Sequence, residues 1–304
     1  MILPELVGEE EISLKLQYNL SMYGDWVIAK GSSIGARHLE DNMPCQDAYN
    51  VFYDNELNYG IAVVSDGAGS AQNSEKGSQF IVNEIVDIFR DKVHNPGFNA
   101  LLEADKHDID LFFISVFKQL RMQLEKYAKS IDMPMESLAA TVILILFSRS
   151  GLICSHIGDG RAGFQDLNDN WHPVLEPYKG SYANHTVFIT SDVWENPQDY
   201  IRTTVINQPI QSFTLMSDGC ENATFELNRF NEETQMYERL NNPYPKFFNP
   251  NVNALRELHK SGKTAMEIDE LWTSFLKNGN KKFESEVDDK TLILGTLTDK
   301  NCNA

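Results

Sequence analysis

Apolar residues recur in short runs from Trp26 onward, and turn-forming residues separate the runs. Such runs, bounded by Gly, Asn and Asp, are typical of β-strands. Successive positions in Thr141–Phe147 are apolar, so both faces of that strand should be covered. A sheet packed on a second sheet, with helices outside, covers both faces. The predicted strands are Trp26–Ala29, Ala48–Tyr53, Tyr59–Val64, Thr141–Ser148, Leu152–Ile157, Ser212–Met216 and Thr291–Leu297.

Three longer segments have the spacing of amphipathic helices, namely Ser74–Val93, Asp108–Ile131 and Lys263–Lys277. Ser74 and Asp108 are candidate N-caps, because their side chains can accept a hydrogen bond from the first turn. The expected fold class is therefore α+β. We predict two packed antiparallel β-sheets flanked by helices, which is an α-β-β-α sandwich.

The composition along the chain indicates one domain with an N-terminal extension and an insertion. Residues 1–25 are predicted to be a short N-terminal extension, and residues 26–304 a single domain. Residues 220–287 are polar and rich in Asn, so they are predicted to be an insertion whose helical part packs on the domain. Within them, Asn241–Asn253 contains several prolines and is expected to be an irregular surface segment that shapes access for a protein substrate.

Charge and cysteine content narrow the classes of function. The 304 residues include 26 Lys or Arg and 44 Asp or Glu, which gives a net charge of −18. That charge disfavours binding to nucleic acid or to anionic membranes. The four cysteines show no paired spacing, and the longest apolar run is too short to span a bilayer. We therefore expect a reduced, cytoplasmic protein without a signal peptide. A monomer is a separate expectation.

The most informative feature is the position of the aspartates. Each of five predicted strands adjoins an aspartate, and four of these lie next to a glycine or a second acid. A single Asp-Gly pair commonly makes only a turn, but turns alone explain five such sites poorly. Converging carboxylates repel one another unless a divalent cation neutralises them, and oxygen ligands favour Mg²⁺ or Mn²⁺ over zinc. The aspartates in question are Asp47, Asp66, Asp159, Asp218 and Asp288.

Taken together, these motifs resemble those of the metal-dependent protein Ser/Thr phosphatases, the PP2C or PPM family. The resemblance covers roughly residues 26–297, and the motifs are specific as a set but weak singly. Gly35–Ala48 is closest to a bacterial branch, some of whose members are associated with kinases and von Willebrand-type proteins linked to tellurite resistance. The segments that carry the resemblance are Asp66–Gly69, Ser137–Val142, Ile157–Arg161, Met216–Gly219 and Asp288–Leu294.

The resemblance implies a protein serine/threonine phosphatase that hydrolyses phosphomonoesters through water held between two Mn²⁺ or Mg²⁺ ions. Asp66 would bridge the two ions, and the Gly67 carbonyl would bind one of them. Asp159 would hold a third, weaker ion, and a slip from Asp288 to Asp289 stays open. The implied partners are a phosphoprotein substrate and a cognate Ser/Thr kinase. The implied metal residues are Asp47, Asp66, Gly67, Asp159, Asp218 and Asp288.

The chain departs from the family at two positions. Many relatives have a phosphate-binding arginine five residues before the first metal-binding aspartate, where this chain has Asn42. Arg37 and His38 are the nearby candidates for phosphate binding. Eukaryotic relatives place a histidine two residues after the bridging aspartate, where this chain has Ala68. These departures leave open a weak or inactive phosphatase-like module that binds phosphoproteins, although such a module has no need for clustered carboxylates.

Two other enzyme classes fit less well. Gly31–Gly35 matches the G-x-S-x-G pattern of serine esterases, which requires a helix directly afterwards. The residues that follow, including Asp41 and Pro44, do not predict one. A phosphatase of the haloacid dehalogenase type would need a different residue than Phe112 after the pair Asp108–Asp110, and that pair begins a helical segment.

Overall fold

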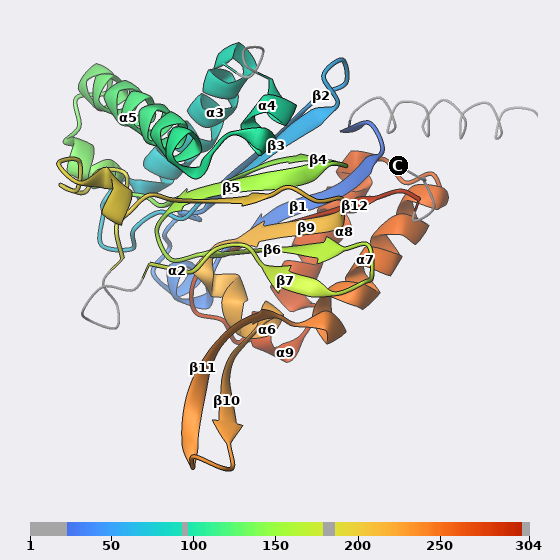
Figure 1. Cartoon of the computed structure of the whole chain (residues 1–304). Coiled ribbons are helices and arrows are strands. Elements are labelled where there is room, and N and C mark those ends of the chain that lie inside the picture. The colour runs from blue at the N-terminus through green and yellow to red at the C-terminus, as the bar shows by residue number, and fades with distance from the viewer. Residues whose placement is uncertain (1–22, 93–96, 179–185, 300–304) are drawn as a thin grey trace, which may run out of the picture.

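The computed structural model describes residues 23–92, 97–178 and 186–299. Two five-stranded antiparallel sheets face each other, and helices cover the outer face of each (Figure 1). The predicted α-β-β-α sandwich is therefore confirmed. Of the predicted extension, residues 1–22 lie outside the described residues.

Each sheet combines strands that are distant in sequence. The first sheet has the order β2-β3-β4-β5-β8, and the second has the order β1-β12-β9-β6-β7. A separate hairpin, β10–β11, projects from the body (Figure 1). The strands are β1 Trp26–Ser33, β2 Ala48–Asp54, β3 Tyr59–Ser65, β4 Val142–Ser148, β5 Gly151–Ile157, β6 Arg161–Asp166, β7 Trp171–Pro173, β8 Arg202–Ile206, β9 Ile210–Met216, β10 Phe225–Asn231, β11 Met236–Pro243 and β12 Lys290–Leu297.

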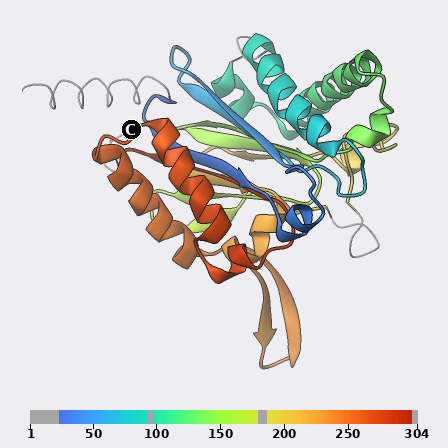
Figure 2. The same ribbon diagram turned by 180° about the vertical axis from the view of Figure 1, so that it is seen from behind.

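Two pairs of long helices form the outer layers. Helices α3 (Ser74–Lys92) and α5 (Lys106–Ser130) pack on the first sheet. Helices α7 (Pro245–Lys260) and α8 (Ala265–Asn278) pack on the second, as the orange helices in Figure 2 show. The shorter elements are α2 Ala36–Glu40, α4 Phe98–Glu103, α6 Glu221–Thr224, α9 Lys281–Glu284, and the 3-10 turns η1 Met135–Leu138, η2 Pro197–Asp199 and η3 Asp218–Cys220.

Strand β4 shows why its sequence is apolar at every position. Its alternate residues Val142, Leu144 and Leu146 join the core beneath α3 and α5. The residues between them, such as Ile143 and Ile145, join the core between the two sheets. Successive side chains of a strand point to opposite faces, so a strand covered on both sides must be apolar throughout. The predicted double coverage is confirmed.

The prediction that Asn241–Asn253 is an irregular segment is wrong. Strand β11 continues to Pro243, and α7 begins at Pro245. A proline at the first helical position costs no hydrogen bond, because that N–H has no partner within the helix. Phe247 and Phe248 then turn into the core against the second sheet. This segment is therefore regular structure and part of the outer helical layer.

Two smaller predictions about helices also need correction. Helix α5 begins at Lys106, so its N-cap is Asp105, whose side chain accepts a hydrogen bond from the Asp108 N–H at 2.9 Å. In α8, Trp272 is buried and its Nε1 donates to the Leu292 carbonyl at 2.9 Å. Leu271, which lies in the helical part expected to pack on the domain, is 49% exposed. The helix therefore uses one face only.

Candidate metal centre

Four of the predicted aspartates meet at one end of the sandwich. Asp66 follows β3, Asp159 follows β5, Asp218 follows β9 and Asp288 precedes β12. They line one open cleft of about 680 Å³. Strand ends fix the backbone of each carboxylate, so the sheet pairing brings together residues that are far apart in sequence. The predicted site residues that line this cleft are Arg37, His38, Asp66, Gly67, Asp159, Asp218 and Asp288.

Asp66 is held by the neighbouring strand entry. Its N–H donates to Thr141 Oγ1 at 3.0 Å, and its carbonyl accepts from the Thr141 N–H at 2.8 Å. Burial raises the pKa of Asp66 well above its ordinary value, and the charges of the other site carboxylates raise it further. At Gly67, an added Cβ would lie 2.6 Å from the Gln46 carbonyl oxygen. Only glycine therefore allows this close approach.

Asp47 is buried and does not line the cleft itself. Ser217 Oγ donates to its Oδ2 at 2.6 Å, and the Thr291 N–H donates to the same hydroxyl at 3.0 Å. Asp47 Oδ1 is buried without a hydrogen-bond partner among the described residues. Burial raises the pKa of Asp47 to about 7. An unpaired buried carboxylate oxygen is costly, so this atom suits a cation.

Asp218, like Asp47, carries a carboxylate whose charge is unfavourable in this environment. Burial raises its pKa to about 8, and the charges of Asp159 and Asp288 act in the same direction. Within the described part of the chain, Asp218 Oδ1 also is buried without a hydrogen-bond partner. The site thus holds carboxylates that favour neutralisation.

The structure separates the roles of the adjacent acids Asp288 and Asp289. Asp289 is 2% exposed and accepts hydrogen bonds from the N–H groups of Gly35 at 2.7 Å and Gln46 at 2.6 Å. Asp288 is exposed and lines the cleft. Asp289 therefore joins the loop before α2 to the loop before β2, and Asp288 is the acid that faces the site.

His38 and Arg37 line the same cleft in different ways. His38 lies within α2 and is buried, with Nδ1 2.9 Å from Asp289 Oδ2. The Arg37 side chain is 78% exposed, and its nearest carboxylate is that of Asp41 at 3.9 Å. His38 is therefore buried next to Asp289, whereas Arg37 is available to an anion in the cleft.

The donor set fits a hard divalent cation. The side chains are carboxylates and, with a backbone carbonyl and water, they supply oxygen only, which favours Mg²⁺ or Mn²⁺. Among residues 23–92, 97–178 and 186–299, no three His, Cys, Asp or Glu side chains already converge tightly enough to enclose an ion. Water would therefore have to complete the coordination, as Mg²⁺ sites commonly require.

Sequence reasoning missed the residues that hold the aspartates. Ser217 lies within a motif that was recognised, but its bond to Asp47 depends on strand pairing. Thr141 marks a strand entry, and its bonds to Asp66 span 75 positions of sequence. Asp289 was visible only as a neighbour of Asp288. A polar residue at the end of an apolar strand was the available signal in each case.

The esterase alternative fails for a different reason than expected. A short helix, α2, does follow Gly35, contrary to the prediction. However, Ser33 belongs to β1, is 6% exposed and pairs in register with Lys290 of β12. A nucleophile elbow needs an exposed serine on a sharp turn, so this serine cannot act as one.

Comparison with known proteins agrees with the fold. A family model described as Protein phosphatase 2C matches residues 34–266. Serine/threonine-protein phosphatase 3 of Escherichia coli (strain K12) is 27% identical over 277 residues, which cover 88% of this chain and 97% of that protein. No helix in the described part of the chain is long and apolar enough to cross a membrane.

Solved structures share the fold at low sequence identity. The serine/threonine phosphatase Stp1 from Staphylococcus aureus superposes with a TM-score of 0.52 at 16% identity, covering 88% of this chain and 94% of that one. The S. agalactiae serine/threonine phosphatase gives 0.53 at 13% identity, covering 90% and 99%. Because the family model matches well over half of its residues, the chain belongs to the protein phosphatase 2C family of metal-dependent protein serine/threonine phosphatases.

Proposed function

We propose that this protein removes phosphate from phosphoserine or phosphothreonine through a site of two divalent cations, Mn²⁺ or Mg²⁺. The observation that carries the proposal is the gathering of Asp66, Asp159, Asp218 and Asp288 in one cleft beside the buried Asp47. The raised pKa values of Asp47, Asp66 and Asp218 mean that these three carboxylates lack a counter-charge. Two cations would supply that charge, lower the pKa of a bound water and stabilise the charge that develops on phosphate.

The residues divide the work of holding the ions. Asp66, which the Thr141 bonds hold in place, would bridge the two ions, and the Gly67 carbonyl would bind one of them. Asp47, Asp218 and Asp288 would complete the coordination, partly through water. Asp159 would hold a third, weaker ion at the edge of the cleft.

Arg37 and His38 would bind the phosphate in place of the arginine that Asn42 replaces. Arg37 is exposed at the cleft and its charge is only weakly paired. His38 Nδ1 lies 2.9 Å from Asp289 Oδ2, which leaves Nε2 as the ring nitrogen for a phosphate oxygen. Both residues would therefore act on substrate binding more than on the attack itself.

The cysteines and one sequence motif bear on the cellular setting. The described cysteines Cys45, Cys154 and Cys220 are free thiols, which fits a reducing cytoplasm. We further propose a monomer that opposes a cognate Ser/Thr kinase, in a system of the kind linked to tellurite resistance. The motif Gly35–Ala48 supports that last point.

A phosphatase assay tests the proposed function. Purified protein should release phosphate from p-nitrophenyl phosphate and from a phosphothreonine peptide when Mn²⁺ is present. EDTA should stop the reaction, and Asp66→Asn should remove it while the protein stays folded by circular dichroism. Activity that survives complete chelation, or that persists in the Asp66→Asn protein, would contradict the two-ion site.

A further inference from the structure

Two of the nine arginines lack a partner among the described residues, and they occur together. Arg202 and Arg239 form no ion pair and no side-chain hydrogen bond with any described residue. Both line one groove of about 360 Å³, together with Arg161. The other arginines bond to a carboxylate or a carbonyl oxygen, and these are Arg37, Arg90, Arg121, Arg149, Arg161, Arg229 and Arg256.

The groove is built from three separate elements. Arg161 comes from β6, Arg202 from β8 and Arg239 from β11 of the projecting hairpin. Asn241 fixes the base of that hairpin, because it accepts a bond from Arg161 and donates to the Leu175 carbonyl at 2.8 Å. Arg239 is therefore presented from an anchored position.

The charge of the groove contrasts with that of the whole chain. Arg161 is paired with Glu221 at 2.8 Å, and Glu176 is the one carboxylate side chain among the lining residues. The groove therefore has two positive charges that are unpaired among the described residues, Arg202 and Arg239, against one negative charge, Glu176. This local excess of positive charge occurs in a chain whose net charge is −18. Exposed arginines without partners bind carboxylates well, because the guanidinium offers paired donors.

The groove adjoins the metal cleft. Asp159 lines the cleft, and Arg161, only two residues later, lines the groove. The Tyr178 N–H donates to the Gly158 carbonyl at 3.0 Å, so the other wall of the groove is tied to the same turn. Figure 1 shows the hairpin projecting near α6, which follows the Asp218 turn. A peptide with its phosphate in the cleft can therefore reach the groove.

One face of the hairpin continues this surface. Arg239 pairs in register with Asn228, and Tyr237 pairs with Phe230 two positions further on. These residues share a face, because strand side chains alternate. Tyr237 is 74% exposed and its ring lies 5.2 Å from that of Phe230. Exposed aromatic residues beside arginine are typical of protein interfaces.

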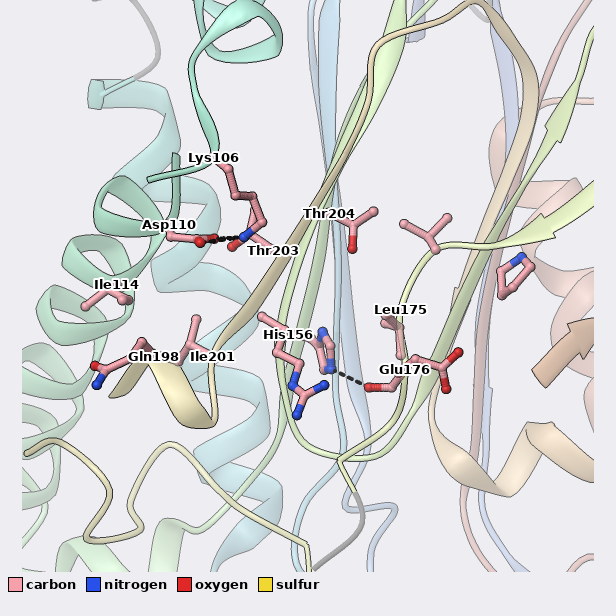
Figure 3. A pocket seen from close by; sticks show the side chains of 13 residues that line it. Lys106, Asp110, Ile114, His156, Leu175, Glu176, Gln198, Ile201, Thr203 and Thr204 are labelled. Atoms are coloured by element: carbon pink, nitrogen blue, oxygen red, sulfur yellow. Dashed lines mark hydrogen bonds and ion pairs between the residues drawn. The ribbon is translucent and has the colours of Figure 1, made fainter. Parts of the chain in front are cut away.

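A neighbouring cleft offers no comparable excess of charge. Figure 3 shows it between α5, β5 and β8, with His156 bonded to the Glu176 carbonyl at 3.2 Å. Its Lys106 is bonded to Asp110 (Figure 3). The charges that remain there are those of Arg202 and Glu176, which are opposite in sign and line both hollows.

We propose that the groove lined by Arg161, Arg202 and Arg239 binds an acidic segment of the phosphoprotein substrate, close to its phosphorylated residue. This inference rests on the proposed function and adds a substrate class to it. The groove would select substrates by the Asp and Glu residues beside the phosphate. The aromatic face of the hairpin would add contact area for the same partner.

A pair of peptides tests the inference. Both carry one phosphothreonine, and Glu residues on both sides in the first are replaced by Gln in the second. With Mn²⁺, the wild-type protein should favour the Glu peptide roughly three- to tenfold in kcat/KM, since exposed charge pairs are individually weak. The preference should fall toward one in Arg202→Gln/Arg239→Gln, and should shrink in added salt. Arg229→Gln, on the opposite face of the same hairpin, should keep the wild-type ratio.

The outcomes separate this inference from the proposed function. A wild-type ratio of one, or a ratio that the double variant leaves unchanged, would overturn the acidic-substrate groove while hydrolysis continues. If neither the peptides nor p-nitrophenyl phosphate is hydrolysed, the proposed function fails instead. In that case, fluorescence anisotropy of the two labelled peptides measures their affinities for the protein. This still tests whether the groove binds acidic peptides, because binding needs no turnover. Equal affinity for both peptides would overturn the inference.

Discussion

At the residue scale, the site carboxylates act against the stability of the metal-free fold. Asp218, whose pKa burial raises to about 8, resists ionisation in the folded state. In the unfolded chain the same group ionises near its ordinary value of 3.8. Between these two values the folded protein binds more protons, so its stability must fall as pH rises.

This argument predicts the pH dependence of the chelated protein. Its free energy of unfolding should fall from pH 6.5 to 8, by up to about 1.4 kcal/mol per pH unit for each such group. Below that window His156, whose pKa burial lowers to about 4, acts in the opposite direction. Urea denaturation in EDTA at several pH values measures the slope. Asp218→Asn should make the slope of unfolding free energy against pH shallower. An identical slope in the two proteins would refute the claim that Asp218 causes the loss of stability.

The adjacent acids Asp288 and Asp289 should respond differently to substitution. Asp289→Ala should cost roughly 2–4 kcal/mol of stability, because two buried N–H groups lose a charged acceptor. Asp288→Ala should change stability by less than about 0.5 kcal/mol, since that side chain is exposed. Mn²⁺ affinity should instead fall in Asp288→Ala. Thermal denaturation and metal titration of both variants check the pair, and the reverse pattern would show that Asp289 is the metal-facing acid.

At the element scale, the register in which β9 and β12 pair determines where site residues lie. Met216 pairs with Leu292 across these strands. That pairing places Ser217 where its hydroxyl accepts the Thr291 N–H and donates to Asp47. Asp47 is therefore oriented by a serine that directly follows a strand of the opposite sheet.

Ser217→Ala should weaken Mn²⁺ binding by about 10- to 100-fold, the effect typical of losing a residue that orients a metal ligand. Ser212 provides a matched control on β9, because it is equally buried but bonds to Gln165 and Thr296. Both variants should lose stability, yet only Ser217→Ala should lose metal affinity. Calorimetric titration measures this, and equal affinities in the two variants would mean that Ser217 only fills space.

The sequence predicted strands well where burial alone decides them. Strand β4, apolar at every position, was predicted from its composition. Strand β8 was missed, because Arg202–Ile206 is partly exposed and exists through its pairing with β5. Helix α7 was mistaken for a loop, because the prolines at its start looked like breakers when Pro245 in fact occupies the first helical position.

For the site, too, the sequence predicted the residues that local motifs define and missed those that depend on sheet pairing. The aspartates were predicted because a motif places each beside a strand or a glycine. Their supports, Ser217 and Thr141, were not, because hydrogen bonds across 170 and 75 positions depend on how the sheets pair. The roles of Ser217 and Thr141 must therefore be tested with variants, because the sequence alone does not reveal them.

At the scale of the whole molecule, the sandwich separates stability from chemistry. Three apolar clusters lie beneath α3 and α5, between the sheets, and beneath α7 and α8. The carboxylates occupy one end of these layers, where strands stop and loops begin. Deep apolar packing can then tolerate repulsion among buried acids, which metal binding would relieve.

The most direct test of the account titrates chelated protein with Mn²⁺ while binding and turnover are measured on the same samples. Calorimetry should report at least two ions per chain, and release of phosphate from a phosphothreonine peptide should rise with occupancy of the second ion. Asp66→Asn should show neither tight binding nor turnover. Full turnover by the metal-free protein, or turnover that is complete with fewer than two ions bound, would contradict the account.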